Sequence, residues 1–491
     1  MDRKEFLKAV RKGVRLRIDD LTLTTPFATY AGRGVLKGIK GDFGLEITLP
    51  SGTEAPESPV GAISVKDFWK LTGIIEDSLL FTVYDLPPPR RSIHGNLVTL
   101  ILKANSVTLT PQGVDRLSHD QIQQYLIAPS DFDGHLLDQP PFIAPAGHQK
   151  CRIEFNGIIP GYELFAKNSG TETKVSHPFL QNAGSSSRGD TLLGTLSTGL
   201  TFCLVERGKE TEFYLRSEDN HISEGEADDL NHFSSFQKAL AFVHGREAWP
   251  FTMQHWRHGQ LILDRVRGWK VAAGTAHTPF NGRLWYNSRV GNIQWDVVPP
   301  IDLAYRFFLR NSPLSRSVGT LLFHYRQAAA SHVHARITAT VLCPLLENLV
   351  RVVDDHFQLL KPNLKFEELQ EELSQLLKLR GASDPDASRR RHHKRLAGVV
   401  RKTPYRGTEE IFRAVFAHLE LKWAGVWEET FVLWKSYRNT LMHGGAASED
   451  YRSDLIVESR IAGLINVIIL RLIGYRGWAQ LSAFDDKLSQ I

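Results

Sequence analysis

The sequence predicts an α+β protein of several domains, with a β-rich N-terminal part and an all-α C-terminal part. At 491 residues the chain is too long for one ordinary hydrophobic core. Short segments that alternate apolar and polar residues fill the chain up to about residue 220, and helical spacing replaces them after Pro313. We expect a β-rich domain over residues 1–245, a Trp-rich connector over 246–312 that closes this domain, and an α-helical domain over 313–491.

Composition limits the class of protein without deciding its function. The chain is 42% hydrophobic and 23% charged, and its net charge of +5 permits an anionic partner without requiring one. The cysteines (Cys151, Cys203 and Cys343) contain no C-x-x-C pair, which argues against a disulfide framework or a zinc ribbon and suits a reducing compartment. No cofactor is expected.

No membrane segment is expected either. The N-terminus has mixed charge rather than the apolar run of a secretory signal. The most apolar window, Ile461 to Ile473, is shorter than the roughly 20 residues of a membrane span, so we interpret it as a buried helix. These features predict a cytoplasmic protein.

The N-terminal part is predicted to be an antiparallel sandwich or a barrel-like domain. Its strands are short and are separated by Gly, Pro, Asn and Asp turns. The predicted strands are Val14–Ile18, Leu45–Leu49, Leu79–Val83, Leu97–Leu102, Val107–Leu109, Ile153–Phe155, Thr201–Val205 and Glu212–Leu215. A helix over Asn231–Gly245 and a strand over Gly259–Leu263 follow them. No phosphate-binding glycine motif occurs in this part.

The C-terminal part is predicted to be a set of helices with one basic loop. The helices cover 315–330, 333–359, 366–380, 409–422, 426–443 and 452–474. Between the third and the fourth, Asp384 to Lys402 contains a basic run (Arg389, Arg390, Arg391, His392, His393, Lys394 and Arg395). Such a run is most often a solvated loop. The functional alternative is an RNA-binding patch that follows a phosphate backbone.

The segment with the strongest chemical pattern is Arg438-Asn439-Thr440-Leu441-Met442-His443. Its spacing alone carries no weight, because a His five to seven residues after an Arg occurs in five places. In this copy Arg438 occupies a position that the apolar stripe of Trp427, Phe431 and Trp434 would fill with an apolar side chain. A guanidinium there needs an anion, which is either an internal carboxylate or a bound phosphate.

The end of this helix supports a role for the histidine. Asn439 and His443 are i, i+4 neighbours, so the amide can orient the imidazole. Gly444-Gly445 stops the helix, and the negative end of the helix dipole favours a protonated His443. The structural alternative is that Arg438 pairs with an internal acid and His443 caps the helix.

Arg438 and His443 cannot act together on one straight helix. Five residues rotate an ideal helix by about 140°, so their side chains leave on different faces. Either the helix end is distorted, or two copies of the chain combine across a symmetric interface.

This segment resembles the R-N-x-x-x-H form of the motif of HEPN domains, small helical domains that include many metal-independent endoribonucleases. The layout is also similar: a long helix around Ile337 to Val353, the motif helix, and a closing apolar helix. A β-rich region ahead of such a domain resembles the ApeA family of anti-phage defence proteins.

The resemblance implies an abortive-infection endoribonuclease with a composite site in a homodimer. His443 would be the general acid–base, Arg438 would hold the scissile phosphate, and Asn439 would position the phosphate or the histidine. The substrate would be RNA such as tRNA, cut without a metal, and the N-terminal domain would sense a phage-derived trigger. The resemblance also implies that Glu347 matches a recurrent acidic position of the first HEPN helix, although its helical phase predicts surface exposure. The alternative is a non-catalytic HEPN-like domain that binds RNA or a nucleotide, or only dimerises.

Overall fold

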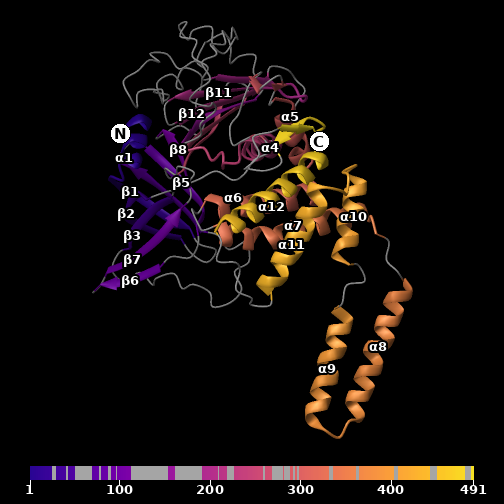
Figure 1. The fold of residues 1–491 in the computed structure, drawn as a ribbon. Coiled ribbons are helices and arrows are strands. Elements are labelled where there is room, and N and C mark those ends of the chain that lie inside the picture. The colour runs from indigo at the N-terminus through magenta and orange to yellow at the C-terminus, as the bar shows by residue number, and fades with distance from the viewer. Residues whose placement is uncertain are drawn as a thin grey trace. The chain divides into compact units, whose positions relative to one another are not determined.

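The structure is a computed structural model of the chain (Figure 1). It describes residues 1–24, 29–39, 42–49, 69–76, 79–86, 90–94, 97–104, 106–111, 153–160, 191–207, 210–217, 226–257, 260–267, 280, 288–290, 293–295, 298–330, 335–360, 364–402, 407–442, 451–480 and 488–490. Cys151, His332 and His443 lie outside these residues.

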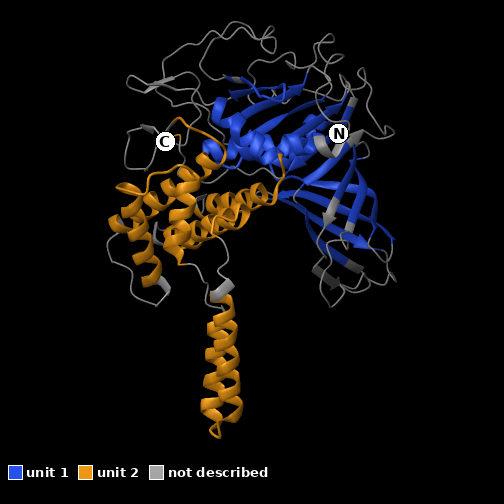
Figure 2. Ribbon diagram, turned by 90° about the vertical axis from the view of Figure 1, so that its right-hand side faces the viewer, with its two compact units in different colours: residues 1–275, 282–309 blue, residues 276–281, 310–491 orange. Residues whose placement is uncertain are grey.

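The chain forms two compact units (Figure 2). The first contains residues 1–275 and 282–309, and the second contains residues 276–281 and 310–491. The first unit is rich in antiparallel strands and the second is helical, as the period of the sequence predicts. Residues 252–267 supply two strands in the middle of the first unit's sheet, so this part of the predicted connector is integral to the N-terminal fold.

The first unit is built on one continuous antiparallel sheet of fourteen strands. Their order is β10-β11-β12-β9-β13-β14-β8-β5-β4-β1-β2-β3-β7-β6. The strands are β1 (Arg15–Thr24), β2 (Thr29–Ile39), β3 (Asp42–Leu49), β4 (Trp69–Ile75), β5 (Leu79–Leu86), β6 (Arg90–His94), β7 (Leu97–Ala104), β8 (Ser106–Pro111), β9 (Ile153–Pro160), β10 (Thr191–Thr195), β11 (Leu200–Arg207), β12 (Glu210–Ser217), β13 (Thr252–Arg257) and β14 (Gln260–Arg267). The described strands hydrogen-bond continuously in this order and form one sheet, whereas the sequence left open a two-sheet sandwich or a barrel-like domain.

One part of this sheet surrounds a core that it shares with the N-terminal helix α1 (Arg3–Arg11). Phe6, Leu7 and Val10 of α1 are buried among the inward residues of β1 to β5, β7, β8, β13 and β14. Helix α1 was not predicted, although a capping box of Asp2 and Glu5 marks its start. Its Arg3 forms a buried ion pair with Asp264 of β14, which joins α1 to the sheet.

Helix α4 (Glu226–His244) covers the other part of the sheet. Phe233 stacks on Phe155 of β9, and Phe236 packs on Phe202 of β11. Helix α5 (Val298–Leu309), which the sequence analysis did not predict, packs against α4. A short hairpin, β15 (Ser288–Val290) and β16 (Ile293–Trp295), precedes α5.

The second unit packs its helices around an aromatic core. The helices are α6 (Pro313–Ala330), α7 (Ala335–Phe357), α10 (Thr408–His418), α11 (Val426–Met442) and α12 (Tyr451–Leu472), and a hairpin of β17 (Trp478–Gln480) and β18 (Leu488–Gln490) follows them. Phe412, Phe416, Trp423, Phe431 and Trp434 contact one another through their rings. The apolar window from Ile461 forms the buried half of α12, as predicted.

The predicted basic loop is a helix. Residues 384–386 form a turn between α8 (Leu364–Ser383) and α9 (Ala387–Lys402), which pack together as a hairpin. The reason is local: Arg and Lys are good helix formers, and the Asp386 carboxylate accepts a hydrogen bond from the Ser388 N–H at 2.8 Å and caps the helix. Charge density favoured a loop in our prediction, whereas helix propensity and the cap decided the structure.

None of the helices in the described parts of the chain is long and apolar enough to cross a membrane.

Candidate functional site

Helix α11 places Arg438 against α7. Trp427, Phe431 and Trp434 are buried on the inner side of α11, as the predicted stripe requires. Acidic residues in the first turn, Glu428 and Glu429, favour this helix start. Arg438 follows on the edge of the same stripe and is partly buried.

The anion that compensates Arg438 is the carboxylate of Glu347 on α7. Arg438 Nε donates to Glu347 Oε2 at 2.8 Å, and Arg351 Nη2 donates to Oε1 of the same carboxylate at 2.9 Å. Two guanidinium groups therefore share one carboxylate, and this three-residue cluster keeps one net positive charge. Of the two anions that the sequence left open for Arg438, the structure contains the internal carboxylate.

Glu347 is more buried than its helical phase predicted. Its side chain is 15% exposed, where the sequence predicted surface exposure, because Arg438 reaches across from α11 and covers it. The Arg438 side chain itself remains 33% exposed. The pair thus has a protected carboxylate and a guanidinium that solvent can reach.

Trp434 fixes the position of Arg438 on α11. The Arg438 guanidinium carbon lies 5.8 Å from the centre of the Trp434 ring, within the range of a cation–π contact. Trp434 Nε1 in turn donates to the backbone oxygen of Cys343 at 3.0 Å, one turn before Glu347 on α7. Burial raises the pKa of the Cys343 thiol to about 12, against the opposing effect of Arg438, so this thiol stays protonated at neutral pH.

Of the other two predicted catalytic residues, the structure describes Asn439 but not His443. Asn439 is exposed on α11, on another side from the Glu347 contact. His443 is outside the described residues, and Met442 is the last residue of α11. The structure therefore tests neither the predicted contact of Asn439 with His443 nor the meeting of Arg438 with His443.

Two acidic residues of α12 near the motif were not predicted from the sequence. Tyr437 donates to Asp454 Oδ1 at 3.2 Å, which joins α11 to α12 beside Arg438. Glu458 lies one turn further along α12, and burial raises the pKa of its carboxyl to about 7. The i, i+4 spacing of these two acids on α12 was the available sequence signal.

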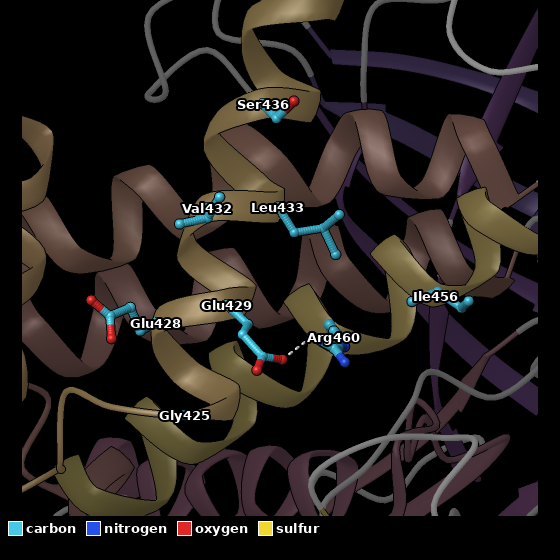
Figure 3. A pocket seen from close by; sticks show the side chains of 8 residues that line it. All are labelled: Gly425, Glu428, Glu429, Val432, Leu433, Ser436, Ile456 and Arg460. Atoms are coloured by element: carbon cyan, nitrogen blue, oxygen red, sulfur yellow. Dashed lines mark hydrogen bonds and ion pairs between the residues drawn. The ribbon is translucent and has the colours of Figure 1, made fainter.

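A groove runs between α11 and α12 on the side of α11 away from α7 (Figure 3). It is lined by Gly425, Glu428, Glu429, Val432, Leu433, Ser436, Ile456 and Arg460. Glu429 and Arg460 form an ion pair at 3.1 Å across it, and Val432 is 60% exposed. Val432, Ser436 and Asn439 follow one another at i, i+4 and i+7, and all three are exposed, so this face of α11 leads from the groove to the motif.

The basic run forms the exposed surface of α9. Arg389, Arg390, Arg391, Lys394 and Arg395 are all exposed, which agrees with the expectation of a solvated segment. Arg389 lies 3.8 Å from Asp386, and Arg390 donates to the backbone oxygen of Asp384. The run is a set of cations fixed on one helix rather than a loop.

In two of the other Arg–His spacings, Arg413/His418 and Arg351/His356, the arginine forms an ion pair with a glutamate one turn earlier on its own helix. Arg413 pairs with Glu409 and lies over the Trp423 ring, and Arg351 pairs with Glu347. Within the described residues, no group of three or more His, Cys, Asp and Glu side chains is arranged to hold a metal ion.

Comparison with protein-family models, with curated proteins and with solved structures found no match for this chain.

Proposed function

We propose that the chain is a metal-independent endoribonuclease of the HEPN type that serves anti-phage defence by abortive infection. The observation that carries this proposal is the Arg438 guanidinium, held against Glu347 and Trp434 with a third of its side chain exposed. Its contact with Glu347 uses Nε, which leaves the two terminal nitrogens to bind a phosphate. The second cation, Arg351, keeps the cluster positive and attractive to an anion.

The reaction that suits these groups is transfer of a phosphate to the neighbouring ribose hydroxyl. His443 removes the proton of the 2′-hydroxyl, and the 2′-oxygen attacks the adjacent phosphorus. The bond from phosphorus to the 5′-oxygen breaks, and that oxygen receives a proton, which leaves a 2′,3′-cyclic phosphate and a 5′-hydroxyl. Arg438 stabilises the charge that develops on the phosphoryl oxygens. The need for a 2′-hydroxyl restricts the reaction to RNA.

The site combines residues of two chains. Arg438 leaves α11 toward α7, whereas Asn439 is on the face that continues the groove. On an ideal helix, five residues rotate by about 140°, so we expect one chain alone not to bring its Arg438 and His443 together. A second copy could dock on the exposed face of α11 that contains Val432 and Asn439. In such a two-fold interface, the motif of one copy would lie next to the motif of the other.

The exposed cations of α9 give the RNA a second contact. Arg389, Arg390 and Arg391 on one helix can bind successive phosphates of a structured RNA such as tRNA. In this proposal the N-terminal sheet unit is regulatory and holds the nuclease inactive until a phage-derived trigger binds.

One observation favours a second candidate, a non-catalytic HEPN-like domain that binds RNA or a nucleotide or only dimerises. Arg438 already has an internal carboxylate partner, which is the arrangement that a purely structural arginine needs. In that case Arg438 holds α11 to α7 and no bond of RNA is broken.

Cleavage of labelled RNA by the wild type, Arg438→Ala and His443→Ala in EDTA separates the two candidates. We expect 2′,3′-cyclic phosphate ends from the wild type and a loss of at least about 100-fold in each variant. The matched control is Arg413→Ala, because Arg413 is also paired with a glutamate, in its case Glu409 on the same helix. Cleavage that survives His443→Ala, or that stops in EDTA, would contradict the proposal.

A further inference from the structure

The α8–α9 hairpin exposes leucines while it buries polar groups. On α8, Leu369, Leu373 and Leu376 are 60%, 45% and 56% exposed. On the side of α8 that contacts α9, Ser374 is buried and donates to the Ala397 oxygen at 3.4 Å. Gln370 likewise donates to the Val400 oxygen. An apolar stripe that points away from the hairpin's own interior marks an interaction surface.

The exposed apolar residues of both helices lie on one face of the hairpin. Leu369, Leu373 and Leu376 follow at i, i+4 and i+7, about 90° around α8 from the side that contacts α9. On α9, Leu396 and Val399 lie at about the same rotation from the side of the helix that contacts α8. Because the two helices are antiparallel, this equal rotation brings both stripes to the same face.

The two apolar stripes are also centred at the same level along the long axis of the hairpin. The contact of Ser374 with Ala397 puts Leu373 level with the segment from Leu396 to Val399. The face is therefore apolar around one point beside Leu373, with the tip of the hairpin on one side and its base on the other. Such a face suits a two-fold axis through this point.

The charges of the hairpin decide which way round a second copy fits. The tip half of α8 carries the exposed cations Lys378 and Arg380. The base half of α8 carries Glu367, Glu368, Glu371 and Glu372. Two hairpins with their tips together would repel each other. In an antiparallel pair with Leu373 opposite Leu373, α8 lies over the partner's α8, so Lys378 and Arg380 of each copy lie beside the acidic segment of the other.

We propose that the α8–α9 hairpin docks face to face and antiparallel on the hairpin of a second copy of this chain. The four helices form a bundle in which Leu373 of one copy lies opposite Leu373 of the other. A nucleic acid or an anionic membrane fits the face less well, because the Glu residues of α8 flank it. The contact does not depend on the nuclease proposal, since it uses neither Arg438 nor His443.

Thiol cross-linking of the full-length protein tests this contact. We expect Leu373→Cys to give a covalent dimer with a short bis-maleimide, because the two-fold axis brings the two thiols together. The matched control is Gln375→Cys, which is also exposed and lies on the opposite face of α8. The wild type is a second control, as its described cysteines, Cys203 and Cys343, are buried.

A second substitution checks the apolar face itself. Adding Leu376→Glu to Leu373→Cys should lower the dimer yield about tenfold by placing charge in the interface. Both residues are exposed, so neither change is expected to unfold the chain. Equal cross-linking of Leu373→Cys and Gln375→Cys, or none from either, would overturn the proposal. The same cross-link in Arg438→Ala keeps this result separate from any loss of RNA cleavage.

Discussion

Glu347 connects the two cations of the candidate site, since its two carboxylate oxygens accept from Arg438 and from Arg351. If Arg438 binds the scissile phosphate, Glu347 is a positioning residue that holds the guanidinium by Nε. If Arg438 is only structural, Glu347 is its counterion and nothing more. The two functions differ in what happens when the carboxylate charge is removed.

Glu347→Gln keeps the shape of the side chain and removes its charge. We expect RNA cleavage to fall about tenfold because Arg438 is less well oriented, while RNA affinity stays the same or rises because one negative charge has gone. Single-turnover cleavage and equilibrium binding measure the two effects separately. Glu409→Gln is the control, as Glu409 also pairs with an arginine one turn later. Wild-type cleavage by Glu347→Gln would show that Arg438 does not need this carboxylate.

Glu458 gives the helical unit a pH dependence of stability. Burial raises its folded-state pKa from 4.5 to about 7, so the unfolded carboxyl ionises at a lower pH than the folded one. The stabilisation from the protonated carboxyl is complete below pH 4.5 and is lost as the pH rises through about 7. Glu458→Gln should remove this loss and raise stability above pH 7 by on the order of 1 kcal/mol, because solvent screens the partly exposed group. Thermal melts at pH 5.5 and pH 8 check this, and an equal pH response in both proteins would contradict it.

At the scale of elements, hydrophobic period predicted α11 and α12 because each has a long apolar stripe that packs in the unit's core. The spacing of apolar residues did not predict α9, because this helix has little apolar stripe. It forms through the helix propensity of its residues and through the Asp386 cap. The same spacing did not predict β13, a mostly polar run whose residues are nearly all buried, or α5, which begins with Val298 and two prolines. In the site, Arg438's need for an anion followed from the sequence. Its partner Glu347 did not, because the two residues are 91 positions apart and only the packing of α7 on α11 joins them.

The basic face of α9 should contribute to RNA binding through charge. Replacing Arg389, Arg390 and Arg391 by Ala should weaken binding and reduce the slope of log affinity against log salt by about 2, since each lost phosphate contact accounts for roughly 0.7 to 0.9. Binding titrations at several salt concentrations measure this slope. The control replaces three exposed lysines of the sheet unit, Lys37, Lys70 and Lys103, which removes the same charge. An unchanged slope in the α9 variant would make this run a solvated surface only.

At the scale of the whole molecule, the chain combines a large antiparallel sheet unit with a helical unit that holds the motif. A ribonuclease that is always active would harm the cell that makes it, so we propose that, if the chain is such a nuclease, the sheet unit controls it. Two surfaces of the helical unit suit a second copy: the groove face of α11 and the leucine face of the α8–α9 hairpin. The first would complete the active site, and the second would hold the assembly together without taking part in catalysis.

Subunit mixing tests the composite site most directly. Arg438→Ala and His443→Ala are each expected to be inactive alone, because each lacks one half of every site. When the two are mixed and allowed to exchange subunits, the mixed dimers keep one site with Arg438 from one chain and His443 from the other. Random exchange should then restore about a quarter of wild-type cleavage, since about half of the dimers are mixed and each has one of its two sites intact. A mixture as inactive as either variant alone, under conditions where tagged subunits are seen to exchange, would contradict the account.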